Sequence, residues 1–148
     1  MSHHQDWAEM RRLAETYAMA MDRNRPDLLE TIFTQDAVLA ATAATYEGME
    51  RILTVPGWLQ QRYIRTFHAV FNHRVEVTGD TAEGETYCRA GHIFKAPAGT
   101  NMINYEMMIR YQDRYRRVDG AWKFSRRELI VEWTQVTEAL QYQAPPAR

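Results

Sequence analysis

Apolar positions recur at helical spacing near the start of the chain. Residues 7–21, "WAEMRRLAETYAMAM", place six apolar side chains on one face, which predicts an amphipathic helix. These side chains are Met10, Leu13, Ala14, Tyr17, Ala18 and Met21. A short second helix is predicted to begin at Pro26, because proline suits the first turn of a helix and prevents the preceding helix from continuing.

From Thr66 onward the pattern indicates long β-strands, separated by the turn signals "TGDT", "APAGT" and "VDG". The strands are predicted at about residues 66–78, 83–96, 101–118 and 121–133. Asp119-Gly120 predicts a tight hairpin between the last two, because glycine tolerates the positive φ of such a turn. Before them, "DAVLAATAATYEG" is typical of a strand and loop, and "MERILTVPGWLQQRYI" of a helical segment broken near Pro56 and Gly57.

Helices first and antiparallel strands afterwards predict an α+β fold. We expect a strongly curved, mostly antiparallel sheet that wraps around the N-terminal helices as a cone with an internal pocket. At 148 residues the chain is expected to form a single domain with one hydrophobic core. The core is expected to span about residues 7–135, and the tail, residues 136–148, to have little to pack against.

Charge and cysteine content narrow the classes of partner. The chain has 18 basic and 19 acidic residues, so no long-range field attracts nucleic acid or an anionic membrane. Cys88 is the one cysteine, and no CxxC or CxxH pair suggests structural zinc. No apolar run approaches the length of a membrane span, and the N-terminus lacks the apolar region of a signal peptide. We therefore expect a soluble, cytoplasmic protein.

The stretch "RTFHAVFNHRVEV" carries two histidines in a predicted strand. Side chains alternate faces along a strand, so His68 and His73 point to opposite faces unless a bulge intervenes. The face with Phe67 and Phe71 is the more apolar, which leaves open whether His68 points inward. Both faces of the sheet can be covered if protomers pack sheet to sheet, and we expect a homodimer or homotrimer. His73 is interpreted as structural or interfacial.

The next two strands give a clearer pattern. In "EGETYCRAGHIFK" the small apolar side chains share a face with Cys88 and His92, which is therefore the inward face. In "INYEMMIRYQDRY" the apolar face includes Met107 and Tyr111. An apolar environment disfavours the charged form of His92. The residues expected to line the pocket near the histidines are Val70, Cys88, Met107 and Tyr111.

Asp22 stands at the expected C-terminal end of the first helix. A negative charge there opposes the helix macrodipole, at a cost of about 0.3–1 kcal/mol. One interpretation is that Arg23 and Arg25 offset this charge or that Asp22 ends the helix in solvent. The other is that Asp22 accepts a hydrogen bond from an imidazole and fixes the tautomer of a histidine base.

The order "YAMAMDRNRPDLLETIFTQDAVL … YEGMERI … RTFHAVFNHRVEV … GETYCRAGHIF … YRRVDGAWKFSRREL" resembles the NTF2-like superfamily in its SnoaL-like branch. The resemblance covers nearly all of residues 7–133 and is strongest to scytalone dehydratase, bile-acid 7α-dehydratase and lindane dehydrochlorinase. It implies an α+β cone with a deep pocket, and elimination of water or HCl without metal or organic cofactor. It also implies that His68 points into the pocket.

The resemblance assigns roles to individual residues. Asp22 and His68 match the catalytic aspartate and histidine, and His92 matches a second histidine of scytalone dehydratase, eight residues beyond a shared glycine. Tyr17 matches a catalytic tyrosine of the bile-acid enzyme, and Arg127 an arginine that the lindane enzyme uses. Without the resemblance, Tyr17 and His92 are more typical of core residues, and Arg127 could equally be in a surface ion pair.

The chain also departs from these relatives. Tyr111 replaces a substrate-binding asparagine of scytalone dehydratase, and Thr42 and Met21 replace its two water-holding tyrosines, so scytalone is not the expected substrate. Ketosteroid isomerase needs an aspartate base near Ala41, and the sequence has none there.

The sequence thus predicts a cofactor-independent, dehydratase-type lyase that acts on a small apolar cyclic or hydroxy-carbonyl substrate. His68, paired with Asp22, would remove an activated proton, Tyr17 would donate to an oxygen of the substrate and His92 would hold the departing hydroxyl. No metal site is expected, because strand parity separates His68 from His73 and no carboxylate completes a ligand set. The alternatives are a non-catalytic ligand-binding or assembly domain, and a cyclase or isomerase of the same superfamily.

Overall fold

Helices occupy the first half of the chain, and the long strands occupy the second half. The computed structural model describes residues 3–97 and 101–139, beginning with α1 (His3–Asp22) and α2 (Pro26–Ile32). None of the helices in these residues is long and apolar enough to cross a membrane. The remaining elements are β1 (Phe33–Ala40), β2 (Thr45–Glu47), α3 (Met49–Ile52), α4 (Val55–Arg62), β3 (Arg65–Thr78), β4 (Thr81–Lys95), β5 (Met102–Val118) and β6 (Ala121–Ala139).

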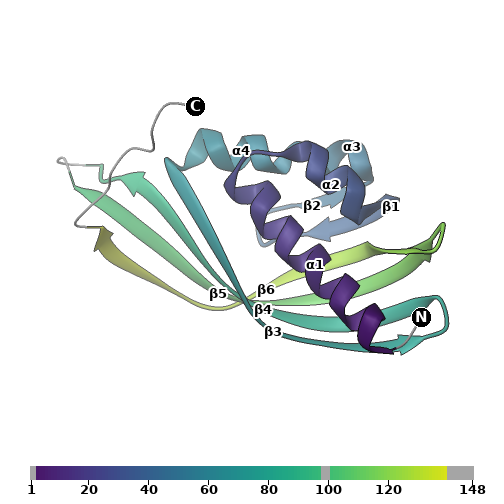
Figure 1. Cartoon of the computed structure of the whole chain (residues 1–148). Coiled ribbons are helices and arrows are strands. Elements are labelled where there is room, and N and C mark those ends of the chain that lie inside the picture. Colours follow the sequence, from purple (N-terminus) through teal and green to yellow (C-terminus); the bar gives the residue numbers. More distant parts are fainter. Residues whose placement is uncertain (1–2, 98–100, 140–148) are drawn as a thin grey trace.

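The six strands form one sheet in the order β2-β1-β6-β5-β4-β3. Neighbouring strands are antiparallel except β1 and β6, which run parallel. The sheet is strongly curved but unclosed, and its long strands bend beneath the helices (Figure 1). The α+β cone predicted from the sequence is therefore confirmed.

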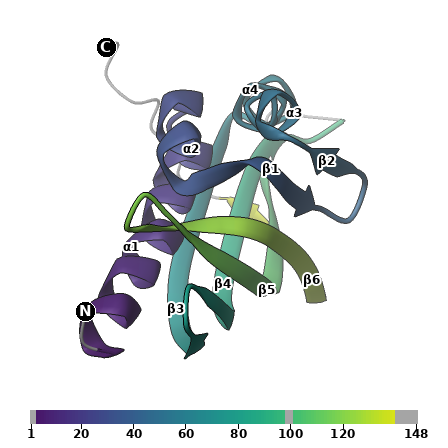
Figure 2. The same cartoon turned by 90° about the vertical axis from the view of Figure 1, so that its right-hand side faces the viewer.

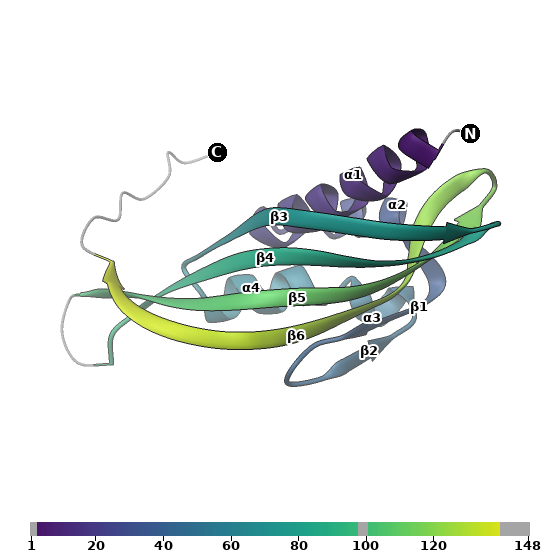
Figure 3. The same ribbon diagram turned by 90° about the horizontal axis from the view of Figure 1, so that it is seen from below.

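The helices cover the concave side of the sheet. α1 packs along β3, whereas α3 packs on β1 and β2 at the other edge (Figure 2). No helix among the described residues covers the opposite face (Figure 3). This face exposes large apolar side chains, including Phe67 at 72% and Trp133 at 60% exposure. That protomers pack sheet to sheet stays a prediction, and this exposed face is the surface to which it applies.

A β-bulge in β3 determines which way its histidines point. Val70 pairs with Cys88 and His73 with Thr86, so two residues of β3 between these pairs oppose a single residue of β4. The extra residue reverses the alternation, and His68, Val70 and His73 all turn toward the helices while Phe67 points outward. The more apolar face of the predicted strand is therefore the outer one up to the bulge, which periodicity alone could not show.

Arg11 of α1 holds the bulge in place. Its Nη2 donates a hydrogen bond to the carbonyl oxygen of Val70 at 3.0 Å, and its Nη1 donates to that of Phe71. The bulge interrupts the regular hydrogen bonding between β3 and β4. Arg11 on α1 supplies the donors for these two carbonyl groups.

Most predicted boundaries lie within a few residues of those in the structure. Asp119 and Gly120 have φ values of +50° and +82°, and they form the predicted hairpin turn between β5 and β6. The helical segment breaks between Ile52 and Val55, earlier than expected, because Pro56 fits the first turn of α4 instead of interrupting a helix.

β6 continues to Ala139, beyond the end predicted at about residue 133, so residues 136–139 of the expected tail are in a strand. These residues pair with β5, where Ala139 lies opposite Met102. Pairing through the backbone does not require apolar and polar side chains to alternate, so the sequence pattern did not indicate this end of the strand. The rest of the expected tail lies outside the described residues.

Gly84 of β4 lies opposite Val75, just beyond the bulge. A Cβ atom at Gly84 would lie 2.8 Å from both the Arg74 carbonyl oxygen and Val75 Cγ1, and 3.1 Å from Tyr115 Cε2. We predict that Gly84→Ala lowers the free energy of unfolding by about 1–3 kcal/mol, because the strand backbone must shift to admit the methyl group. Urea unfolding monitored by circular dichroism measures the change.

Gly57→Ala is the matched control. Gly57 lies in α4, and a Cβ atom there meets nothing nearer than Asn24 Oδ1 at 4.0 Å. Alanine in a helix loses less conformational entropy than glycine, so this variant is expected to be more stable by about 0.5–1 kcal/mol. An unfolding midpoint of Gly84→Ala equal to that of the wild type would contradict the close packing described for β4.

Candidate active site

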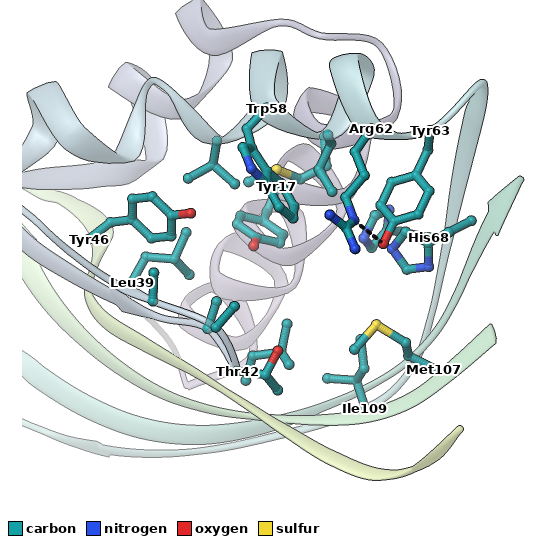
Figure 4. A pocket seen from close by; sticks show the side chains of 18 of the residues that line it. Tyr17, Leu39, Thr42, Tyr46, Trp58, Arg62, Tyr63, His68, Met107 and Ile109 are labelled. Carbon is teal, nitrogen blue, oxygen red and sulfur yellow. Dashed lines mark hydrogen bonds between the residues drawn. The ribbon is translucent and has the colours of Figure 1, made fainter. Parts of the chain in front are cut away.

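The sheet and the helices enclose a cavity of about 620 Å³. α1, α4, the loop between β1 and β2, and the inner faces of the long strands contribute to its wall, which is mostly apolar and aromatic (Figure 4). Of the residues expected to line the pocket, His68, His92, Tyr17, Tyr111 and Met107 do so. A mostly apolar cavity with a few polar groups aimed into it is typical of small-molecule sites.

Asp22 and His68 are in direct contact at one side of this cavity. The carboxylate Oδ1 lies 2.6 Å from His68 Nδ1 and accepts a hydrogen bond from Thr66 Oγ1 at 2.8 Å. Oδ2 accepts one from the backbone N–H of His68, also at 2.8 Å. Asp22 is the last residue of α1, so these donors offset the unfavourable position of its charge at the helix C-terminus.

The contact with Asp22 fixes the tautomer of the neutral His68 imidazole. A carboxylate only accepts hydrogen bonds, so in the neutral imidazole of His68 the proton is on Nδ1 and Nε2 carries the lone pair. The ring lines the cavity, whereas the carboxylate lies behind it, facing a smaller surface groove between α1 and β3. The neutral form of His68 therefore presents a basic nitrogen to any molecule in the cavity.

The surroundings of Asp22 favour its ionised form. Burial acts to raise the pKa of the carboxyl group, but the hydrogen bonds and charge of His68 and the hydrogen bond from Thr66 outweigh burial and hold the pKa below its usual value. The carboxylate is therefore present at neutral pH, where it orients the ring and stabilises the positive charge that a base acquires.

His92 lies next to His68 with its own fixed tautomer. The two rings meet edge to face, with centroids 5.9 Å apart. Nδ1 of His92 lies 3.1 Å from the carbonyl oxygen of Tyr105, so Nδ1 donates and Nε2 is left as an acceptor. Burial and the charge of His68 lower the pKa of His92, so the ring is neutral at neutral pH. His92 can therefore accept a hydrogen bond from a hydroxyl group in the cavity.

Tyr17 and Tyr111 form the floor of the cavity. Their rings meet edge to face at 5.7 Å, and both side chains are almost fully buried. Burial raises the pKa of both phenols, so each keeps its proton and acts as a hydrogen-bond donor. Tyr111 Oη has no hydrogen-bond partner of good geometry among the described residues, whereas the hydroxyl of Tyr17 points into the cavity (Figure 4).

Arg127 lies behind these tyrosines, outside the cavity wall. Its Nε and Nη2 donate to Asp113, both at 2.8 Å, and the pair is buried. Its guanidinium carbon lies 4.6 Å from the ring centroid of Tyr17 and 4.1 Å from that of Tyr111. Arg127 is thus neither in a surface ion pair nor in reach of a ligand, and it supports the tyrosine rings from behind.

Two of the residues expected to line the pocket, Val70 and Cys88, lie apart from its wall, and so does His73. Cys88 is buried beneath the wall, and burial raises the pKa of its thiol to about 12. Val70 lies beside Asp22 and His68 at the surface groove between α1 and β3. His73 sits deeper, where Nε2 lies 3.2 Å from the hydroxyl of Tyr115, and burial lowers the pKa of His73 to about 4. Its neutral ring belongs to the polar network around Asp113, consistent with the structural interpretation.

α4 and Tyr63, the residue that follows it, contribute side chains to the cavity wall that the sequence pattern did not reveal. Trp58, Arg62 and Tyr63 line the cavity, and Tyr46 of β2 faces them from the other side (Figure 4). Trp58 and Arg62 are four residues apart on α4 and therefore share one helix face, a spacing visible in "GWLQQRY". In residues 3–97 and 101–139, no group of three His, Cys, Asp or Glu side chains is clustered so as to hold a metal ion.

The chain is similar to known proteins in both sequence and fold. A model of the SnoaL-like domain family matches residues 2–128. The uncharacterized protein Rv2910c of Mycobacterium tuberculosis is 29% identical over 126 residues, which are 82% of either chain. The crystal structure of a type 2 hexachlorocyclohexane dehydrochlorinase (LinA) superimposes with a TM-score of 0.77 at 25% identity, over 95% of this chain and 94% of that one. The Kfla4162 protein of Kribbella flavida gives a TM-score of 0.80 at 18% identity, over 90% and 95%.

We predict that Asp22→Asn lowers the free energy of unfolding at pH 7 by about 1–3 kcal/mol. In the variant one carboxylate oxygen is replaced by an amide N–H₂ group, which faces a hydrogen-bond donor and cannot accept a hydrogen bond from it. The carboxylate has a lowered pKa in the folded state, so its stabilisation is full above its usual pKa of 3.8 and is lost as pH falls through the folded value. The difference between wild type and variant should therefore shrink at pH 3. Urea unfolding at both pH values measures it.

Asp36→Asn serves as the control, because Asp36 is exposed and pairs with Arg116 at the surface. Such a pair contributes at most about 1 kcal/mol, and less in salt. If Asp22→Asn were as stable as the wild type at pH 7, the carboxylate would not be stabilised by its contacts as described.

Proposed function

The chain belongs to the SnoaL-like family, and we propose that it is a cofactor-independent lyase of the dehydratase type that acts on a small apolar cyclic or hydroxy-carbonyl compound. The observation that carries this proposal is the contact of Asp22 with His68 at the wall of an apolar cavity. A domain that only binds other proteins has no need of this pair beside a cavity. The likeness to a dehydrochlorinase, whose name describes elimination of HCl, supports the same class of reaction.

In the proposed reaction, Nε2 of His68 removes a proton from the carbon next to a carbonyl group. The electron pair of that C–H bond forms the new double bond as the C–O bond to the β-hydroxyl breaks. The hydroxyl departs with the proton held by His68, so one water is released and the imidazole returns to its neutral form. Asp22 stabilises the imidazolium while the proton is held.

Two neighbouring groups assist these steps. Tyr17 keeps its proton, so it donates a hydrogen bond to the carbonyl oxygen as negative charge develops there. His92 accepts a hydrogen bond from the hydroxyl that leaves, because its Nε2 has a free lone pair. The apolar wall excludes water, which strengthens both interactions.

An isomerase of the same family is the second candidate. It is favoured by the lack of an Asp or Glu side chain among the described residues that line the cavity, since no carboxylic acid is there to protonate a leaving group. A base that returns its proton to another carbon of the substrate uses the same groups. Such a reaction leaves the mass of the substrate unchanged.

We predict turnover of at least one compound in a panel of cyclic β-hydroxy ketones and hydroxyacyl thioesters, seen by mass spectrometry as loss of one water. His68→Ala should lower kcat by about 10²- to 10⁴-fold, the usual contribution of general acid-base catalysis. Asp22→Asn should lower it less, because the imidazole remains but its tautomer is no longer fixed.

His73→Gln is the control, because it removes an imidazole from the same strand but not from the cavity, and its kcat should match that of the wild type once its folding is verified. Equal turnover of the same substrate by wild type, His68→Ala and Asp22→Asn would contradict the mechanism. Conversion without a change in mass would assign the chain to the isomerase alternative.

A further inference from the structure

The cavity wall carries one permanent charge. Among its lining residues in the described part of the chain, Arg62 is the one Arg, Lys, Asp or Glu. Asp22 is nearby, but its carboxylate lies behind His68 and is occupied by hydrogen bonds from Thr66 and His68. The interior that a ligand meets is therefore apolar with a single positive group.

Arg62 is held in place without being neutralised. Its Nε donates to the hydroxyl of Tyr63 at 3.3 Å, and its guanidinium carbon lies 5.5 Å from the ring centroid of Trp58 and 5.8 Å from that of Tyr63. These aromatic rings flank the cation and limit its positions. Within the described residues, no carboxylate forms an ion pair with it, and its two terminal nitrogens keep their N–H groups for another acceptor.

The position of Arg62 relates it to the reactive side of the cavity. The side chain reaches from the last turn of α4 into the cavity, on the side where His68 lies (Figure 4). Tyr63, which accepts its hydrogen bond, packs its ring on His92 with centroids 4.7 Å apart. Arg62 itself is exposed to solvent, so the cation lies at the rim, beyond the histidines.

We propose that the substrate carries a carboxylate group, which Arg62 binds at the rim while the apolar body of the substrate fills the cavity. A guanidinium with two free terminal nitrogens matches the two oxygens of a carboxylate. A phosphate group would bring up to two negative charges against one cation. The inference rests on the proposed function in one respect, that this cavity is the substrate site.

Arg62 then contributes to ground-state binding and selectivity, and Tyr17 remains the donor to the reacting carbonyl oxygen. This division distinguishes a permanent carboxylate from the transient oxyanion of the reaction, because only the former is bound when no chemistry occurs. Recognition can therefore be measured with ligands that do not react.

The test compares 2-naphthoate with the nearly isosteric, uncharged 2-naphthamide, each titrated into the protein by isothermal calorimetry. The wild type should bind the carboxylate about tenfold more tightly or better, as expected for hydrogen bonds between charged groups. Arg62→Gln should bind the two ligands about equally, whereas Arg62→Lys should retain part of the preference. Arg51→Gln removes a charge from an exposed position on α3 outside the cavity and should keep the full preference.

Equal affinity of the wild type for both ligands, or an unchanged preference in folded Arg62→Gln, would overturn the inference. So would loss of the preference in Arg51→Gln, since it would indicate a general charge effect. The outcome is independent of catalysis: a preference that depends on Arg62 without any elimination would leave this inference standing and the proposed function wrong. Elimination from neutral substrates at a rate that Arg62→Gln does not change, without a carboxylate preference, would leave the proposed function standing and this inference wrong.

Discussion

Asp22 connects the end of α1 to the beginning of β3 through hydrogen bonds to Thr66 and to the backbone and ring of His68. This one carboxylate satisfies a strand N–H, sets the tautomer of the imidazole and balances the charge that a base would acquire. Its position at a helix C-terminus is unfavourable by itself. The hydrogen bonds to β3 offset this unfavourable charge. The residue that lowers the stability of the helix end is therefore also the one that orients His68.

The other parts of the site depend on how the sheet presents its inner face. The bulge in β3 lets His68 and His73 share a face, although strand alternation assigns them to opposite ones. His68 then faces the cavity, whereas His73 joins the buried network of Asp113, Arg127 and Tyr115. That network supports the tyrosines on the cavity floor, and Arg62 on α4 adds a cation at the rim.

Much of this arrangement could be predicted from the sequence, for identifiable reasons. The 3.6-residue and two-residue periodicities located α1 and the long strands, and Asp119-Gly120 located the last hairpin. The inward direction of His68 could not be derived from alternation, because a bulge leaves no periodic signal, and the resemblance to a family supplied it. The partner of Arg127 was hidden by a register shift between β5 and β6, which places Asp113 opposite it. Arg62 was missed because α3 and α4 are short and irregular, and only the folded chain shows which face of α4 meets the cavity.

The central claim is that Asp22 holds His68 with its proton on Nδ1 and a basic Nε2 toward the cavity. Nitrogen-15 NMR of the imidazole, with the His68 signals assigned by comparison with His68→Gln, measures this tautomer directly. For the neutral ring the account predicts a protonated Nδ1 and an unprotonated Nε2 in the wild type, and loss of this preference in Asp22→Asn. A wild-type ring protonated on Nε2, or a tautomer unchanged in Asp22→Asn, would contradict it.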